Sequence, residues 1–179
     1  MGFMNNEPRE LHIVIRDMVI DDMATVFHLG ETLFTSGELP ILYRTWDAYE
    51  VTNYFNTDPD FCLVAEESGE IVGFALGTTF EKEGSPWKYG YLAWIGVKEG
   101  QQNRGIGKRL YRELERRMKE EGVRMVIVDS ESDNKDALAF FQRRGFSVAE
   151  EHIWLSKILR RKGQKGKRTK NIKNQKHKE

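Results

Sequence analysis

The stretch VKEGQQNRGIGKRLY, residues 97–111, decides how the rest of the chain is interpreted. Gly105 and Gly107 stand one residue apart, with basic residues around them and a helix-like run after them. The start of a helix leaves unpaired N–H groups and the positive end of the helix dipole, and both favour anions such as phosphate. Glycine also lets an anion approach the backbone without a Cβ in between. The stretch therefore predicts an anion-binding loop that joins a strand to a helix.

Two familiar phosphate-binding loops do not match this spelling. A Walker loop needs Lys and then Ser or Thr after its second glycine, whereas Gly105 is followed by Ile106 and Gly107. A dinucleotide fingerprint that starts at Gly105 needs glycine, or a close equivalent, where the chain has Leu110. The loop must therefore be interpreted together with the elements around it.

Strand-like and helix-like periodicities alternate along the chain on both sides of the loop. The pattern is typical of an α+β fold, in which the segment 61–80 forms a β-hairpin around the turn SGE. We expect helices at 20–34, 45–58, 106–121 and 134–144, and strands at 11–18, 61–67, 71–80, 88–97 and 123–130, the last one buried, with one or two closing strands in 146–159.

Length and composition favour one globular domain. The chain has 179 residues, of which 39% are hydrophobic, so it can bury a sizeable core. Its single cysteine, Cys62, excludes an internal disulfide framework, and the four histidines lack metal-ligand spacing, so no metal site is expected. We see no signal peptide and no apolar run of about 18 residues, and we therefore expect a cytoplasmic protein without a membrane span.

The net charge of zero conceals a strong asymmetry. Residues 157–179 contain eleven Lys or Arg and one acid, +10, whereas residues 1–156 contain 17 basic and 27 acidic residues, −10. We therefore expect a folded domain at 1–158 and a basic, disordered tail at 159–179. The tail is either a solvated extension or a contact for RNA or the ribosome.

Two motifs in register resemble those of the GNAT N-acetyltransferases. The first is Q-x-x-G-x-G, formed by Gln102, Gly105 and Gly107 after a strand, and the second is N-x-x-A-x-x-F-F-x-x-x-G-F from Asn134 to Phe146. The order of strands and helices from about 88 to 148 also agrees. The resemblance implies a GNAT fold: a mixed, mostly antiparallel twisted sheet with flanking helices and a splayed strand pair. It also implies acetyl-coenzyme A as co-substrate.

The resemblance further implies which residues hold the coenzyme. Ile95, Gly96 and Val97 would pair with the pantetheine arm, and Gly96 is the residue most tolerant of a strand bulge there. Asn134 would either bond the coenzyme arm or cap its helix, and both roles are compatible. Phe141 stands where the family commonly has Tyr. The pyrophosphate would be held by the loop, which contributes Gln102, Asn103, Arg104, Gly105, Ile106, Gly107 and Lys108.

Acetyl transfer to an amine requires the neutral amine. A lysine side chain with a pKa of ~10.4 is only about 0.04% neutral at pH 7, so a general base is expected. Asp129 matches the position of the base Glu in ribosomal-protein-alanine acetyltransferases, one methylene shorter, and its alternative role is to cap a turn. Tyr91 is the second candidate. Phe141 cannot protonate the leaving thiolate, which leaves water, another phenol such as Tyr111, Tyr89 or Tyr91, or unaided departure.

The sequence thus predicts an N-acetyltransferase that acts on a primary amine: a protein N-terminus, a lysine or a small amine. The acidic body favours a cationic acceptor, including a basic peptide. The alternative is a non-catalytic module that senses acetyl-coenzyme A and docks through its tail. The acceptor and the oligomeric state, monomer or dimer, stay open.

Overall fold

The structure is a computed structural model, and it describes residues 12–35 and 46–148. The chain divides into two compact units, residues 1–131 and 132–179. We describe each unit by itself. The described part of the first unit contains a five-stranded sheet with three α-helices, and the described part of the second contains one helix.

The sheet of the first unit follows the order of the chain, β1-β2-β3-β4-β5. Strands β1 to β4 pair with one another in antiparallel orientation, and β5 pairs with β4 in parallel orientation. This is the mixed, mostly antiparallel sheet that the sequence predicted. The strands are β1 (Ile13–Asp17), β2 (Cys62–Glu67), β3 (Glu70–Glu81), β4 (Lys88–Val97) and β5 (Val123–Ile127).

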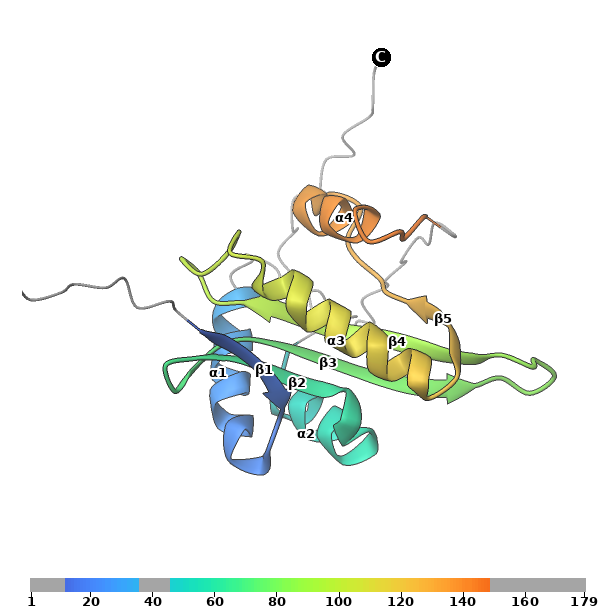
Figure 1. Ribbon diagram of the computed structural model, residues 1–179, viewed down its shortest axis with the longest axis horizontal. Coiled ribbons are helices and arrows are strands. Elements are labelled where there is room, and N and C mark those ends of the chain that lie inside the picture. The colour runs from blue at the N-terminus through green and yellow to red at the C-terminus, as the bar shows by residue number, and fades with distance from the viewer. Residues whose placement is uncertain (1–11, 36–45, 149–179) are drawn as a thin grey trace, which may run out of the picture. The chain divides into compact units, whose positions relative to one another are not determined.

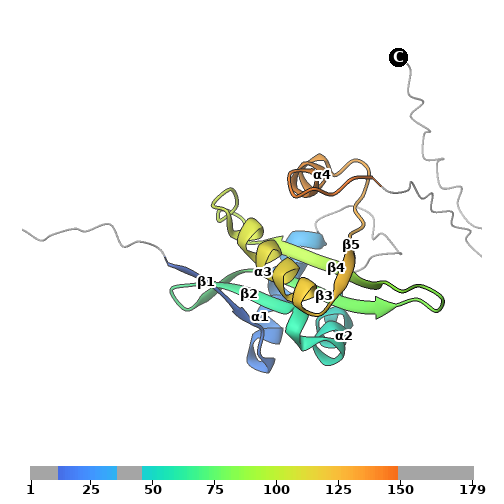
Figure 2. The same cartoon turned by 45° about the vertical axis from the view of Figure 1, so that its right-hand side comes forward.

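Helices cover both faces of this sheet. Figures 1 and 2 show α3 across one face, with α1 and α2 on the other. No helix among the described residues is long and apolar enough to cross a membrane. The helices are α1 (Met23–Phe34), α2 (Ala48–Thr57) and α3 (Ile106–Glu120). A short 3₁₀ turn, Ile20–Asp22, leads into α1, and a second one, Pro59–Phe61, leads into β2.

The α3 face of the sheet is lined by small residues, so the helix lies close to it. A Cβ added at Gly77 would meet Met118 Cε at 3.1 Å and Leu114 Cδ1 at 3.4 Å. Leu114 and Met118 are fully buried, as is Leu110 one turn earlier in α3. The amphipathic pattern of α3 thus places one stripe of apolar side chains on the sheet.

The opposite face carries an aromatic core. Trp46, Phe74 and Trp94 are buried, and the Trp46 and Trp94 rings lie 5.1 Å apart, edge to face. Phe34 of α1 packs on Trp94 at 4.8 Å. Gly96 allows this close approach, because a Cβ there would meet Leu33 Cδ1 at 2.6 Å. Burial of such large rings makes this cluster a main source of hydrophobic stabilisation.

Most expected elements are confirmed, and the differences have local causes. Helix α2 begins at Ala48 rather than 45, because the Asp47 side chain accepts hydrogen bonds from the Tyr49 and Glu50 amides and caps the helix. The expectation of a buried strand at 123–130 is wrong: β5 ends at Ile127, and only Val123 is buried in it. Among the described strands, β5 pairs only with β4.

The second unit is described from 132 to 148. Helix α4 (Lys135–Gln142) begins at the N-cap Asn134, whose Oδ1 accepts a hydrogen bond from the Ala137 amide at 3.1 Å. Phe141 is buried, and its ring packs edge to face against Phe140 and Phe146 at 5.1 and 5.3 Å. Residues 146–148 form no regular structure. The rest of the expected closing strands and the tail at 159–179 lie outside the described residues.

Candidate active site

The loop between β4 and α3 has the backbone that its glycines suggested. Asn103 and Gly105 take positive φ angles of 63° and 80°, and Gly105 occupies the N-cap position of α3. No side chain of the described residues caps this helix. Its first internal hydrogen bond runs from the Arg109 amide to the Gly105 carbonyl at 3.0 Å. The amides of the first turn, at Ile106, Gly107 and Lys108, therefore precede the helical ladder and suit an anion.

Two ion pairs tie the ends of this loop to the β2–β3 hairpin. At its start Lys98 Nζ lies 3.3 Å from Glu70 Oε2, and both side chains are exposed. At its end Arg104 forms a bidentate pair with Glu67, at 2.6 and 2.9 Å, and the Glu67 side chain is buried. The hydrogen bonds from Arg104 hold the pKa of Glu67 below its usual value. Arg104 was expected to add charge for a pyrophosphate, and the structure also gives it this anchoring role.

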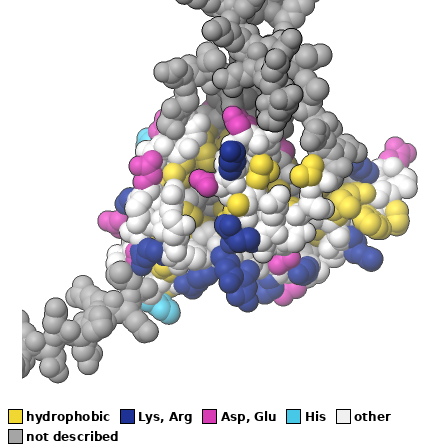
Figure 3. All heavy atoms as spheres, turned by 90° about the horizontal axis from the view of Figure 1, so that it is seen from above, with side chains coloured by type: hydrophobic (Ala, Val, Ile, Leu, Met, Phe, Trp, Pro, Cys, Tyr) yellow, Lys and Arg dark blue, Asp and Glu magenta, His cyan; other side chains and the backbone are white. Residues whose placement is uncertain are grey.

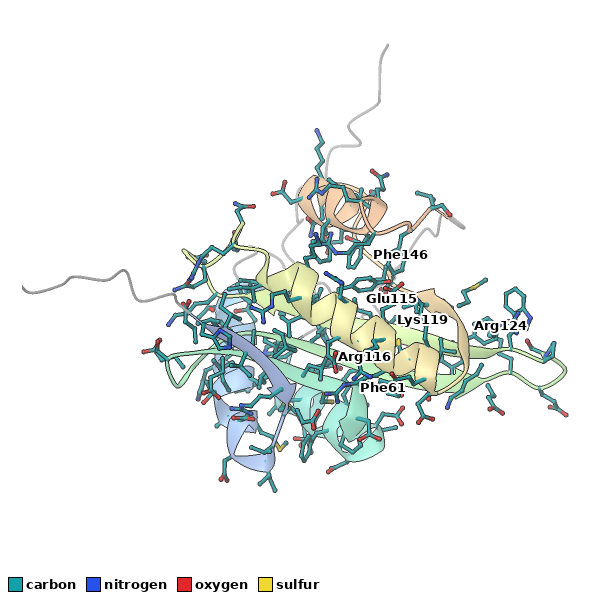
Figure 4. The ribbon with its side chains drawn as sticks, viewed as in Figure 1. Phe61, Glu115, Arg116, Lys119, Arg124 and Phe146 are labelled. Carbon is teal, nitrogen blue, oxygen red and sulfur yellow. The ribbon has the colours of Figure 1, made fainter. Side chains whose placement is uncertain are left out.

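Cations accompany the loop along the outer side of α3. Lys108 and Arg109 are exposed in its first turn. Further along, Arg116 pairs with Glu113 and Glu120, and Lys119 pairs with Glu115. The side chains of Arg116 and Lys119 project from the helix in Figure 4, and Figure 3 shows Lys and Arg gathered along one edge of the surface. Because the later cations already have acidic partners, Lys108 and Arg109 are the ones placed to serve an anion at the loop.

The pairing between strands β4 and β5 stops partway along β4. Their last paired residues are Tyr91 and Ile127, whereas β4 stays paired with β3 as far as Val97 opposite Gly73. Within the described sheet, the second edge of β4 from Leu92 to Val97 thus has no strand beside it. The expected splayed pair is present, and Ile95, Gly96 and Val97 lie in the splayed half.

The bulge of β4 lies elsewhere than expected. The register places Trp94 opposite Leu76 and Leu92 opposite Gly77, so Ala93 is the extra residue. The expectation of a bulge at Gly96 is wrong: Gly96 pairs regularly with Phe74. Its lack of a side chain serves the close packing of α1 instead.

This bulge changes which side chains share a face. Residues three apart in a regular strand point to opposite faces. Trp94, however, belongs to the aromatic core of the α1 and α2 face, and Tyr91 packs against the same cluster. Thr78, the partner of Tyr91 in the register, also faces this side, because its hydroxyl donates to Asp58 at the end of α2. The extra residue therefore brings Tyr91 and Trp94 onto one face.

The two residues nominated for catalysis meet where the strands part. Asp129 lies two residues beyond the end of β5, and its Oδ1 accepts a hydrogen bond of 2.6 Å from the Tyr91 phenol. Both side chains are half-buried. A carboxylate held in this way by a phenol is oriented, and a carboxylate is a group that can accept a proton from a substrate.

The other candidates take simpler positions. Gln102 is exposed, with its amide 3.5 Å from the Val97 carbonyl. Tyr89 hydrogen-bonds Ser85 in the β3–β4 connection at 3.1 Å, and Tyr111 is buried in α3. Asn134 and Phe141 lie in the second unit, described above. Among the described residues, no cluster of three or more His, Cys, Asp or Glu could hold a metal ion.

Sequence reasoning missed three contributors to this region. Glu67 and Glu70, which anchor the loop, belong to a run of acids with no individual signal. Glu50 accepts a hydrogen bond from the Trp94 indole across the sheet face at 2.7 Å, and no local pattern links residues 44 positions apart. An acid in the first turn of a helix, such as Glu50, is common because it interacts favourably with the helix dipole, so its presence indicates no special role.

Comparison with known proteins decides the family. A model of the acetyltransferase (GNAT) family matches residues 24–146 of the chain. The chain belongs to the GNAT acetyltransferase family. An acetyltransferase of Sodalis glossinidius is 28% identical over 131 residues, 72% of this chain and 88% of its own. A mycothiol acetyltransferase of Streptomyces avermitilis is 31% identical over 96 residues, 54% of this chain and 30% of its own.

Solved structures share the GNAT fold. An aminoglycoside N-acetyltransferase in complex with CoA superposes with a TM-score of 0.68 at 22% identity, covering 84% of this chain and 98% of its own. Ard1 from Thermoplasma volcanium gives 0.66 at 20% identity, with 77% and 84% covered. This GNAT chain is therefore an acyltransferase, and its co-substrate is acetyl-coenzyme A.

The residues present fit that co-substrate. The uncapped first turn of α3 suits the pyrophosphate, and the open space around the Gly105 Cα position leaves the backbone accessible. Beyond Tyr91 no described strand lies beside the second edge of β4, and the backbone groups of Ile95, Gly96 and Val97 there are of the kind that a pantetheine amide bonds. The first turn of α3 thus suits the pyrophosphate, and the edge of β4 suits the amides of the pantetheine arm.

Proposed function

We propose that this GNAT enzyme transfers acetyl to a primary amine by direct attack, with Asp129 as the general base and Tyr91 as the group that orients it. The observation that carries the proposal is the 2.6 Å hydrogen bond between Tyr91 and Asp129 beside the splayed edge of β4. The aminoglycoside enzyme of the same fold is, by its name, an N-acetyltransferase, which supports an amine acceptor.

The parts of the site divide the work. The loop from Gln102 to Lys108 holds the pyrophosphate, and Ile95, Gly96 and Val97 hold the pantetheine arm. Bound acetyl-coenzyme A supplies the acetyl thioester that the amine attacks; the N–C bond forms, the C–S bond breaks, and coenzyme A leaves as a thiolate, which a thiol pKa of about 8.5 allows without a protein acid. Asp129 accepts the proton that the amine loses, so the amine reacts in its neutral form. Tyr91 donates its hydrogen bond to the Asp129 carboxylate and keeps that carboxylate in place.

The acceptor is a primary amine on a peptide N-terminus, a lysine or a small molecule, and the −10 charge of residues 1–156 favours a cationic one. A panel that contains an N-terminal peptide, a lysine peptide and small amines, assayed by release of the coenzyme thiol, identifies it. Absence of thiol release with the whole panel would instead favour the sensing module.

The test of the base is Asp129→Asn. We expect the rate to fall by about 10²–10⁴, the usual contribution of a general base, with little change in coenzyme affinity. The acidic limb of the pH–rate profile should disappear with it. Glu131→Gln is a matched control, because it removes a carboxylate from the same connection at an exposed position. An Asp129→Asn enzyme with normal turnover and an unchanged profile would exclude Asp129 as the base.

A further inference from the structure

Glu50 is a half-buried carboxylate that has no cationic partner among the described residues. Its Oε2 accepts a hydrogen bond of 2.7 Å from the Trp94 indole, and it forms no ion pair with any residue in 12–35 or 46–148. Four other shielded carboxylates of the first unit have a cationic partner. Arginine pairs with each of Asp22, Glu66, Glu67 and Glu113. The charge of Glu50 therefore has no counterpart in the described protein.

The position of Glu50 is fixed by the aromatic core. Trp94 is only 7% exposed, and the rings of Phe34 and Trp46 pack on it at 4.8 and 5.1 Å. Its indole N–H consequently points in one direction and holds the carboxylate there. From the other side, the Asp47 cap fixes the first turn of α2, which carries Glu50.

Glu50 also lies on the same face as the proposed base. The bulge at Ala93 brings Tyr91 and Trp94 onto the face that α1 and α2 cover, and Tyr91 bonds Asp129 whereas Trp94 bonds Glu50. Three residues of strand span about 10 Å. Two carboxylates are thus each held by an aromatic side chain of β4, and the backbones of these two aromatic residues are about 10 Å apart along the strand.

We propose that Glu50 binds a second positive charge of the acceptor, so that the preferred substrate is a primary amine with another cationic group about 10 Å or less from the reacting nitrogen. This inference rests on the proposed amine acetylation. Two structural roles of Glu50 do not account for its charge. The indole needs only an acceptor oxygen, which an amide supplies as well, and the helix start already has Asp47 as its cap.

The experiment compares a linear five-carbon diamine with the monoamine of the same length. In the wild type we expect KM for the diamine to be about tenfold lower, equivalent to ~1.4 kcal/mol, well above the statistical factor of about two for its two amines. Glu50→Gln should keep the indole hydrogen bond and remove the preference, through KM rather than kcat. Asp47→Asn is the control: it removes a charge from the same turn, keeps the cap, and should retain the preference.

The results distinguish a failure of the role of Glu50 from a failure of the proposed amine acetylation. An unchanged ratio of the two KM values in Glu50→Gln, in an enzyme that still acetylates amines, would overturn the role of Glu50 alone. Loss of the preference in Asp47→Asn as well would show a general effect of charge and would also overturn it. Failure of the wild type to acetylate any amine would overturn the proposed function and this inference together. Thermal unfolding of each variant shows that the fold is retained.

Discussion

Tyr91 and Asp129 are 38 positions apart in the chain and meet through a single hydrogen bond. Tyr91 lies in the last pair that joins β4 to β5, so its backbone is held on both sides. Asp129 lies two residues beyond the end of β5 and belongs to no helix or strand. The strand residue therefore positions the loop residue, which is the order of support that a catalytic carboxylate requires.

Tyr91→Phe tests this support without disturbing the ring. It removes one hydrogen bond to a carboxylate, so we expect kcat/KM to fall by about tenfold to 100-fold, corresponding to ~1.5–3 kcal/mol. If the phenol acts through Asp129, the double variant with Asp129→Asn should be no slower than Asp129→Asn alone. Additive losses in this double-mutant cycle would show that Tyr91 has a separate role, such as proton donation.

At the scale of elements, the loop that we propose as the pyrophosphate site is held to the β2–β3 hairpin at both ends. The Lys98–Glu70 pair is exposed, whereas the Arg104–Glu67 pair places a buried carboxylate beneath the loop. The Lys98 amide also donates to the Val72 carbonyl at 2.9 Å. An isolated loop would lose conformational freedom on binding the coenzyme, and these anchors reduce that cost in advance.

Glu67→Gln should therefore weaken coenzyme binding without contacting the ligand. We expect Kd to rise by about threefold to tenfold, because the loop must then be ordered on binding. Calorimetry with coenzyme A measures the change. Glu70→Gln removes the exposed pair from the same hairpin and should leave Kd within about twofold. Equal effects of the two variants would mean that the loss of negative charge, rather than the anchor, sets the affinity.

The same pair predicts how stability depends on pH. The pKa of Glu67 is lowered in the folded protein by Arg104, so the pair stabilises the fold above the ordinary Glu value near 4.5. That contribution is lost as the pH falls below this value. Between about pH 5 and 3, the melting temperature of Glu67→Gln should thus decline less than that of the wild type. Parallel declines would show that the pair has no linkage to protons.

The loop and its helix could be predicted because their signal is local. Gly105, Gly107 and the apolar stripe of α3 are neighbours in sequence, and the bounds of β4 were predicted to the residue. The bulge could not be predicted, because Leu92, Ala93 and Trp94 are all apolar and a shift of one residue changes no polarity. Glu67 was equally hidden: nothing in an acidic run reveals which side chain an arginine 37 positions away will reach.

At the scale of the whole molecule, the C-terminal segment differs in charge from the rest of the chain. Residues 1–156 carry −10 and residues 157–179 carry +10. The basic segment lies outside the described residues, and its role is a proposal from composition alone. Clustered Lys and Arg bind nucleic-acid phosphates by releasing counterions, which makes RNA or the ribosome the expected partner.

Removal of residues 160–179 should change location rather than fold. These residues are almost without apolar side chains, so we expect the melting temperature to shift by less than about 2 °C and acetylation of a small amine to continue. Affinity of the full chain for bulk RNA should fall by about 10³-fold or more between roughly 50 and 200 mM salt if six or more phosphates are contacted. A truncated protein that unfolds would show that the segment is structural. A full chain that ignores RNA at low salt would leave it a solvated extension.

The extra residue at Ala93 also affects how the lineage of this protein can be traced. It shifts the alternation of β4 by one step, so the strand has two halves whose inward and outward positions follow different parity. A relative that lost this residue would show the same letters with the opposite orientation on one side of the gap. Side chains matched letter by letter across this point would then not be counterparts in space. Ancestral reconstruction and the transfer of substrate-determining residues between paralogues should therefore treat the segments before and after Ala93 as separately aligned blocks.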